Sequence, residues 1–80
     1  MSREPQEYAG LPYRRVWEWR EDDAEPYWVV HLAEIPEVVG DGASRSEAEA
    51  ALRQCLEDYA AYRQAEGLEI PEPEARAAAG

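Results

Sequence analysis

The stretch that decides the fold is Ile35 to Gly67, IPEVVGDGASRSEAEAALRQCLEDYAAYRQAEG, which predicts a short strand followed by one capped amphipathic helix. Ser44 and Glu47 form an S-x-x-E capping box, in which the Ser44 hydroxyl accepts an amide proton and Glu47 reaches back. Gly67 supplies a left-handed stop. Between these ends an apolar stripe recurs at steps of four and three, comprising Ala48, Leu52, Cys55, Leu56, Tyr59 and Tyr62.

Two strands are predicted before this segment, joined by an acidic turn. The first, Tyr13 to Arg20, alternates with period two and places on one face Tyr13, Arg15, Trp17 and Trp19. The second, Tyr27 to Leu32, is apolar on both faces, as is typical of a central strand. The connector Glu21 to Pro26, EDDAEP, has hairpin length and ends in proline, which lacks the N–H that a ladder requires.

The remaining segments complete one small domain. Val38 to Asp41 predicts a third strand, and the triplet Gly40 to Gly42 predicts a turn rather than a phosphate site. Leu68 to Ile70 is compatible with a fourth strand. We expect an α+β domain over residues 13–71, a two-layer β-β-β-α-(β) arrangement whose three- to four-stranded antiparallel sheet is covered on one face by one long helix.

The two ends are predicted to lie outside this domain. Residues 1–12 mix proline, glycine and charges, which predicts a flexible leader from which Tyr8 and Leu11 reach the body. Residues 72–80 are acidic and then rich in alanine, which predicts a frayed tail.

Composition narrows the classes of partner. The 80 residues carry a formal net charge of −10, from 18 acidic and 8 basic side chains. Such a surface repels phosphate, so we expect no direct nucleic-acid or membrane partner, whereas a basic protein is attracted. We also expect a cytoplasmic protein, because neither a membrane span nor a signal peptide is visible. A thin core favours a homo-oligomer, a dimer or a larger assembly.

No pattern predicts catalysis, a cofactor or a metal. His31 is a lone histidine inside an apolar strand, which is typical of a packed residue. The carboxylates of the connector suit a basic partner or a hard cation, or form a solvated turn; they are Glu21, Asp22, Asp23 and Glu25. Residual magnesium-dependent hydrolysis would need carboxylates to converge, and only Glu18 lies within a regular strand pattern.

The aromatic residues are candidate anchors for a partner. If Trp17, Trp19, Tyr27 and Val29 face away from the helix, they form an apolar patch of the kind that marks an interface. Trp17, Trp19 and Trp28 could instead stack bases of RNA, but such platforms sit in positive grooves, and Arg14, Arg15 and Arg20 are the one local cationic exception.

The order of these elements resembles the HicB-type antitoxin family. The matching segments run from the Tyr13-led strand through EDDAEP and YWVVHL to the turn Ala33-Glu34-Ile35-Pro36, then Val38-Val39, Gly42-Ala43-Ser44, Ser46-Glu47-Ala48, Ala51-Leu52, Leu56 and Pro71 to Pro73. Glu37 departs from the family pattern, which commonly has glycine there. The family's frequent C-terminal DNA-binding domain is not expected after the acidic tail.

The resemblance implies a degenerate ribonuclease-H-like domain without nuclease residues. It also implies a partner, a small basic toxin ribonuclease of the HicA type whose active site the domain masks. We therefore expect a non-enzymatic antitoxin-type domain that uses the acidic loop Glu21 to Glu25 and the sheet edge. The alternative is a stand-alone homo-oligomeric interaction module without a toxin, anchored by the tryptophans.

Overall fold

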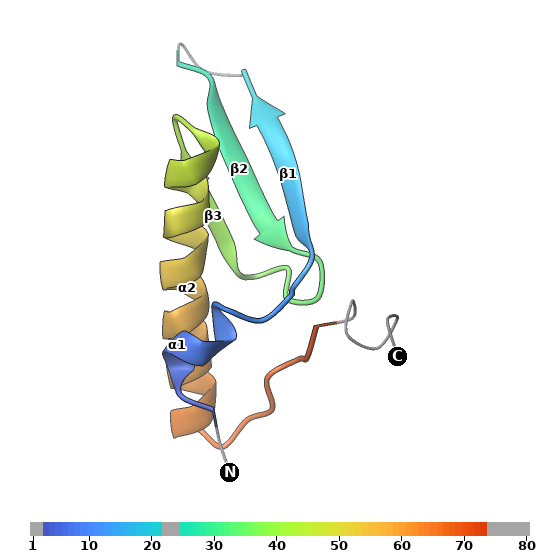
Figure 1. Ribbon diagram of the computed structural model, residues 1–80, viewed down its shortest axis with the longest axis vertical. Helices are drawn as coiled ribbons and strands as arrows, with labels where there is room; N and C mark the ends of the chain where they lie inside the picture. The colour runs from blue at the N-terminus through green and yellow to red at the C-terminus, as the bar shows by residue number, and fades with distance from the viewer. Residues whose placement is uncertain (1–2, 22–24, 74–80) are drawn as a thin grey trace.

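The computed structural model describes residues 3–21 and 25–73, which form a three-stranded antiparallel sheet and one long helix (Figure 1). The elements in chain order are α1 (Pro5–Tyr8), β1 (Arg15–Arg20), β2 (Tyr27–Leu32), β3 (Val39–Gly42) and α2 (Arg45–Ala65). This is the predicted α+β arrangement, with β2 in the centre of the sheet order β1-β2-β3.

The register of the sheet places each side chain on one of two faces. Trp17 lies opposite Val30 and Trp19 opposite Trp28 in the antiparallel β1–β2 pair. Val30 and Trp28 in turn lie opposite Gly40 and Gly42 of β3, respectively. These residues share the face that α2 covers, because directly opposed residues point to the same side of a sheet.

Both predicted ends of α2 are present. The Ser44 hydroxyl accepts the Glu47 amide at 3.2 Å. At the other end Gly67 adopts a φ of 71°, and the amides of Gly67 and Leu68 donate to the carbonyls of Gln64 and Arg63 at 3.2 and 2.8 Å. This pair of bonds is a Schellman motif. The return bond expected from Glu47 is not formed among the described residues, so only half of that capping box is confirmed.

The buried stripe of α2 differs from the predicted one. Its buried residues follow a strict step of four, Ala48, Leu52, Leu56 and Ala60. Tyr62 was expected on the stripe but is 61% exposed, and Cys55 is only half-buried. A step of four drifts slowly around a helix, so the contact stays on one narrow seam, and a narrow seam suits a helix that lies along a single short strand.

That strand is β3, against which α2 packs with almost no side chain between the two backbones. A Cβ built on Gly40 would lie 2.4 Å from both the Ala48 carbonyl oxygen and the Leu52 nitrogen, and one built on Gly42 would lie 2.6 Å from the Glu47 Cβ. The GDG triplet is therefore strand rather than the predicted turn. Its glycines are needed because any side chain would push the helix away.

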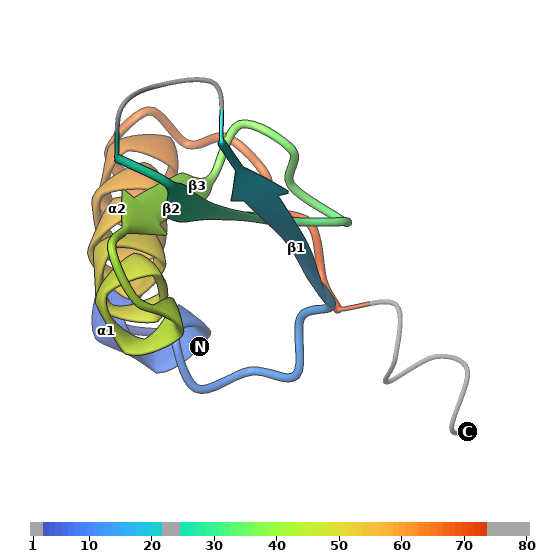
Figure 2. The same cartoon turned by 90° about the horizontal axis from the view of Figure 1, so that it is seen from above.

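The helix lies over β3 and part of β2, whereas β1 stands farther from it (Figure 2). The core between the layers contains Val30, Leu32, Ile35, Val38, Leu52 and Leu56, all almost fully buried. A sheet covered on one side only leaves its other side to solvent, which is the two-layer arrangement expected from the sequence.

The two ends of the chain belong to the domain more than the sequence predicted. Residues 5–8 form α1, which contacts α2, and Tyr8 and Ala9 are buried. A single turn starting at Pro5 has no periodicity to detect, but the Glu4 amide donates to Glu7 Oε1 at 2.6 Å and holds it closed. Residues 3–12 thus contact the domain more extensively than the two predicted contacts of Tyr8 and Leu11.

The C-terminal segment is extended but is not a strand of the sheet. Residues 68–70, a possible fourth strand, lie outside any ladder, and the Tyr13 hydroxyl donates instead to the Pro71 carbonyl at 2.6 Å. Glu72 pairs with Arg3 at 3.0 Å, and Pro73 is buried. The predicted frayed tail therefore starts too early, and its remaining residues, 74–80, lie outside the described part.

Replacing Gly40 by valine should destabilise the protein by about 3 kcal/mol or more, because the new side chain would force α2 off β3. The measurement is the free energy of unfolding from urea denaturation. Gly10→Ala is the matched control, since a Cβ there meets only the Glu7 oxygen at 3.6 Å and should change stability little. Equal stability of the Gly40→Val variant and the wild type would contradict the direct backbone contact.

Candidate functional site

The three tryptophans lie together on the helix-covered face, beside the first turn of α2. Trp17 meets Trp28 edge to face with ring centroids 6.0 Å apart, and Trp19 lies 5.1 Å from Trp28. The condition for an apolar patch that includes Trp17 and Trp19, that they face away from the helix, is therefore not met. Strand alternation shows which residues share a face, but a tertiary contact decides which face meets the helix.

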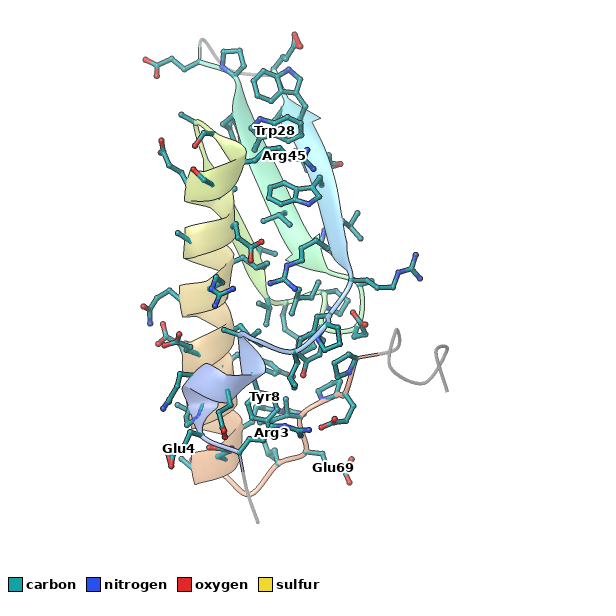
Figure 3. The ribbon with its side chains drawn as sticks, in the orientation of Figure 1. Arg3, Glu4, Tyr8, Trp28, Arg45 and Glu69 are labelled. Atoms are coloured by element: carbon teal, nitrogen blue, oxygen red, sulfur yellow. The ribbon has the colours of Figure 1, made fainter. Side chains whose placement is uncertain are left out.

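Arg45 occupies this cluster. Its guanidinium carbon lies 4.5 Å from the centre of the Trp17 ring and 5.0 Å from that of Trp28, and Figure 3 shows Arg45 and Trp28 pointing toward one another. Arg45 is the first residue of α2, where the helix dipole disfavours a positive charge. Stacking on two indole faces offsets that cost and fastens the start of the helix to β1 and β2.

A second link joins β1 to the helix. The Arg15 guanidinium donates to both carboxylate oxygens of Glu49, at 3.2 and 2.8 Å, and to the Tyr13 carbonyl at 3.0 Å. Both charged side chains are partly buried. A bidentate pair of this kind fixes the orientation of β1 relative to α2 as well as attracting the two elements. It therefore holds β1 in place although β1 lies away from the main core.

The opposite face of the sheet carries no described helix. One row across its three strands consists of Val16, His31 and Val39, and Val16 and Val39 are 40% and 47% exposed. The next row consists of Glu18, Val29 and Asp41. We call these six residues the open face, an apolar centre with a carboxylate at each end of its second row.

His31 lies in the middle of the open face and is half-buried between the two valines. Within residues 3–21 and 25–73, no three His, Cys, Asp or Glu residues are grouped so as to hold a metal ion. Glu18 is engaged by Arg20 at 2.8 Å, whereas Asp41 is exposed with no ion pair in the described part of the chain. The open face thus offers surface rather than a reaction centre.

Glu21 and Glu25 of the acidic connector flank the end of the β1–β2 hairpin. Glu21 accepts a hydrogen bond from the Trp19 indole at 2.7 Å, and both Glu21 and Glu25 are exposed. Asp22 and Asp23, also predicted to bind a partner, lie outside the described residues. The structure therefore joins the acidic connector to the tryptophan cluster through the Trp19–Glu21 bond.

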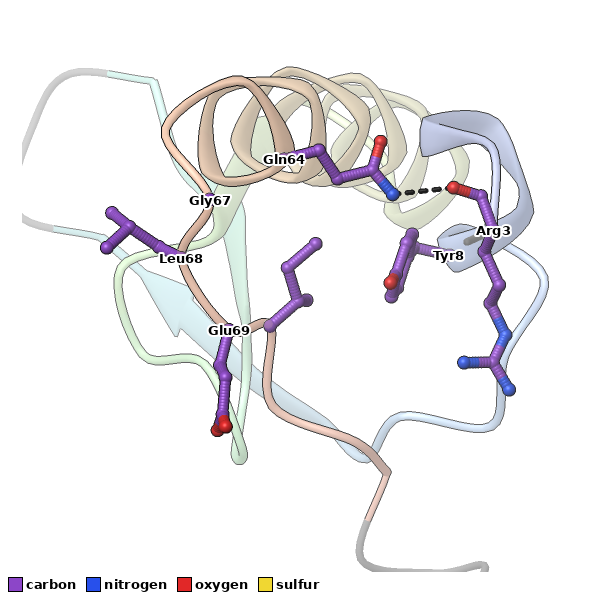
Figure 4. A pocket seen from close by; sticks show the side chains of 7 residues that line it. Arg3, Tyr8, Gln64, Gly67, Leu68 and Glu69 are labelled. Carbon is purple, nitrogen blue, oxygen red and sulfur yellow. Dashed lines mark hydrogen bonds between the residues drawn. The ribbon is translucent and has the colours of Figure 1, made fainter. Parts of the chain in front are cut away.

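An open hollow lies at the far end of the molecule, between α1, the end of α2 and the C-terminal segment (Figure 4). Arg3, Tyr8, Gln64 and Ile70 are among its lining residues, and the Gln64 amide donates to the Arg3 carbonyl at 2.5 Å. Arg3 also lies over the Tyr8 ring at 5.8 Å. Arg3 and Gln64 are thus already bonded within the fold, and the hollow lies where the two ends of the described chain meet α2.

Tyr13 closes the same end and is 3% exposed. Burial, with a smaller contribution from the Glu72 charge, raises the pKa of Tyr13 from 10.0 to about 12. The hydroxyl thus keeps its proton, which it donates to Pro71, at pH values where an exposed tyrosine would ionise.

Comparison with known proteins adds no relative. No protein-family model, no curated protein and no solved structure matches this chain. None of the described helices has the length and apolar character needed to cross a membrane. The resemblance to HicB-type antitoxins therefore remains a prediction made from the order of its motifs.

Sequence reasoning missed the Arg15–Glu49 pair and the stacking of Arg45 on the tryptophans. The Arg15–Glu49 pair depends on how β1 and α2 pack, and no short-range sequence pattern predicts it. The second left one signal, a positive charge at the first position of a capped helix, where it is disfavoured. Both residues fasten β1, so both help to shape the edge and faces described above.

Between pH 10 and pH 12 the stability of the wild type should fall by about 2 kcal/mol, because an unfolded Tyr13 loses its proton while the folded one keeps it. Tyr13→Phe should be less stable at neutral pH by about 1 kcal/mol and should lack that fall. Urea unfolding followed by circular dichroism at each pH measures both effects. Tyr62→Phe, at an exposed site, should behave as the wild type; an unchanged fall in Tyr13→Phe would contradict this role.

Proposed function

We propose that this chain is a non-enzymatic, HicB-like antitoxin-type domain that binds and masks a small basic toxin ribonuclease. Masking an active site requires a complementary surface and no catalytic group, so the proposal needs neither a cofactor nor a metal. A cytoplasmic location, where such a toxin would meet messenger RNA, is part of the same proposal.

The observation that carries the proposal is that most positive side chains are bound within the fold, whereas several negative ones face solvent. Six of the seven described arginines are engaged within the fold: Arg3 with Glu72, Arg15 and Arg53 with Glu49, Arg20 with Glu18, Arg45 with the tryptophans, and Arg63 with Tyr59 and the Glu69 carbonyl. The side chain of Arg14 is exposed. Exposed carboxylates such as Glu25 and Asp41 remain directed to solvent. The surface is therefore acidic, and it attracts cationic proteins.

The open face supports a protein partner in particular. Its exposed valines, Val16 and Val39, form an apolar centre, and Glu18 and Asp41 stand at the ends of the neighbouring row. Protein interfaces commonly combine an apolar core with a charged rim. A basic protein with an apolar ridge between lysine or arginine side chains would match this pattern, and the exposed Glu21 and Glu25 extend the acidic rim to the hairpin.

A direct test uses the small basic protein encoded next to this chain in its genome. Co-expression should restore the growth of cells that the basic protein arrests, and the purified chain should stop it from cleaving RNA. If cleavage proceeds equally with and without this chain, the antitoxin proposal fails. The absence of any adjacent basic reading frame would favour the alternative, a homo-oligomeric interaction module.

Asp41→Lys should weaken binding to the basic partner by about tenfold, because a carboxylate at the rim becomes a repelling cation. Isothermal titration calorimetry measures the affinity. Asp58→Lys, on the solvent side of α2, makes the same charge change away from the open face and should have little effect. Glu21→Lys tests the hairpin in the same way. An equal loss for Asp41→Lys and Asp58→Lys would show only a general charge effect and would remove the open face from the interface.

A further inference from the structure

The outer edge of β1 has free backbone hydrogen-bonding groups. The Ala33 amide donates to the Arg14 carbonyl at 2.9 Å, which makes Arg14 and Ala33 a hydrogen-bonded pair of the β1–β2 ladder. Such pairs alternate along an antiparallel ladder, so the even-numbered residues of β1 turn their backbone groups to β2. The odd-numbered residues, Arg15, Trp17 and Trp19, turn theirs outward, where no described strand meets them.

We propose that the C-terminal half of β1, residues 18–20, pairs antiparallel with the same residues of a second copy of this chain, so that two three-stranded sheets join into one of six strands. A twofold axis perpendicular to the sheet would relate the copies and keep both helices on the same side. This inference concerns the edge of the sheet, shares only Glu18 with the open face, and does not depend on a toxin.

The charges on β1 select one register. With Trp19 opposite Trp19 of the second copy, Glu18 lies opposite Arg20 of the second copy, and the same pair recurs across the axis. These are the non-hydrogen-bonded positions, where side chains approach most closely. Glu18 and Arg20 already lie on one face, with their charged groups 2.8 Å apart, so little rearrangement is needed.

Neighbouring registers are disfavoured. Because alternate residues must stay on their own face, the strand can shift only in steps of two. One step places Glu18 against Glu18 of the second copy, and a step the other way places Arg20 against Arg20. Shifts further toward the start of β1 oppose Arg14 to Arg20, or bring the buried Tyr13 opposite Trp19.

Trp19 provides the apolar contact of this pairing. It is 44% exposed on the helix-covered side and lies against Trp28. In the proposed register the two copies of Trp19 meet at the axis, which joins two tryptophan clusters. The edge also suits a second copy of an acidic chain, because residues 14–21 contain three arginines and two glutamates, unlike the acidic protein as a whole.

The test is the dimer dissociation constant of the full chain, measured by sedimentation equilibrium for four variants. Glu18→Arg should raise it about tenfold, because two attractive pairs become two repulsive ones, and Arg20→Glu should do the same. The double exchange Glu18→Arg with Arg20→Glu should restore the wild-type value. Asp58→Arg, on the solvent side of α2, is the matched control that should leave it unchanged.

Amide hydrogen exchange gives an independent reading. In the wild-type dimer the amide of Trp19 should exchange slowly, and the single charge reversals should make it exchange fast. A chain that is monomeric at all concentrations, or a dimer that is indifferent to the exchanges, would overturn the proposal. Slow exchange that appears only when a basic partner is added would assign the edge to that partner instead, and would overturn it equally.

Discussion

The contact between the backbones of α2 and β3 is the constraint on which the other features of the structure depend. Gly40 and Gly42 leave no room for a side chain beneath Ala48 and Leu52, so helix and strand meet directly. Residue size then increases across the sheet, from glycine on β3 to Val30 on β2 and tryptophan on β1. The helix therefore sits over one side of the sheet, and the bulky residues fill the space beside it.

This off-centre helix explains why β1 is fastened by long side chains. Arg15 on β1 binds Glu49 on the helix, and Arg45 on the helix stacks on Trp17 of β1. Only long side chains can link β1 to α2, because β1 lies outside the direct contact between α2 and β3. The Arg15–Glu49 pair is partly buried and bidentate, so it should stabilise the fold more than an exposed ion pair usually does. Because Arg15 and Arg45 are bound within the fold, their positive charges do not offset the exposed carboxylates. The surface of the protein is therefore acidic.

The features of the fold that depend on residues close together in the sequence could be predicted from it. Ser44 and Gly67 mark the ends of α2 because a cap and a left-handed residue act within a few positions. Alternation likewise identified which residues of β1 and β2 share a face. The side on which the helix packs, the role of Gly40 and the exposure of Tyr62 could not be predicted, since each depends on which strand the helix meets. For the candidate site, the acidic hairpin was visible in sequence, but the open face required the register of all three strands.

The free edge of β1 and the open face of the sheet are formed by different groups, because successive residues of a strand alternate in direction. Even-numbered residues of β1 point their side chains to the open face and their backbone groups to β2, while odd-numbered residues turn their backbone groups to the free edge. A second copy at the edge would thus leave Val16, Val39 and Asp41 uncovered. A twofold axis perpendicular to the sheet would place both open faces on one side, so two basic partners, or one partner with two sites, would meet a paired surface. Binding at two linked sites is tighter than at either alone, which makes pairing through β1 a means of strengthening the proposed masking rather than a competitor to it.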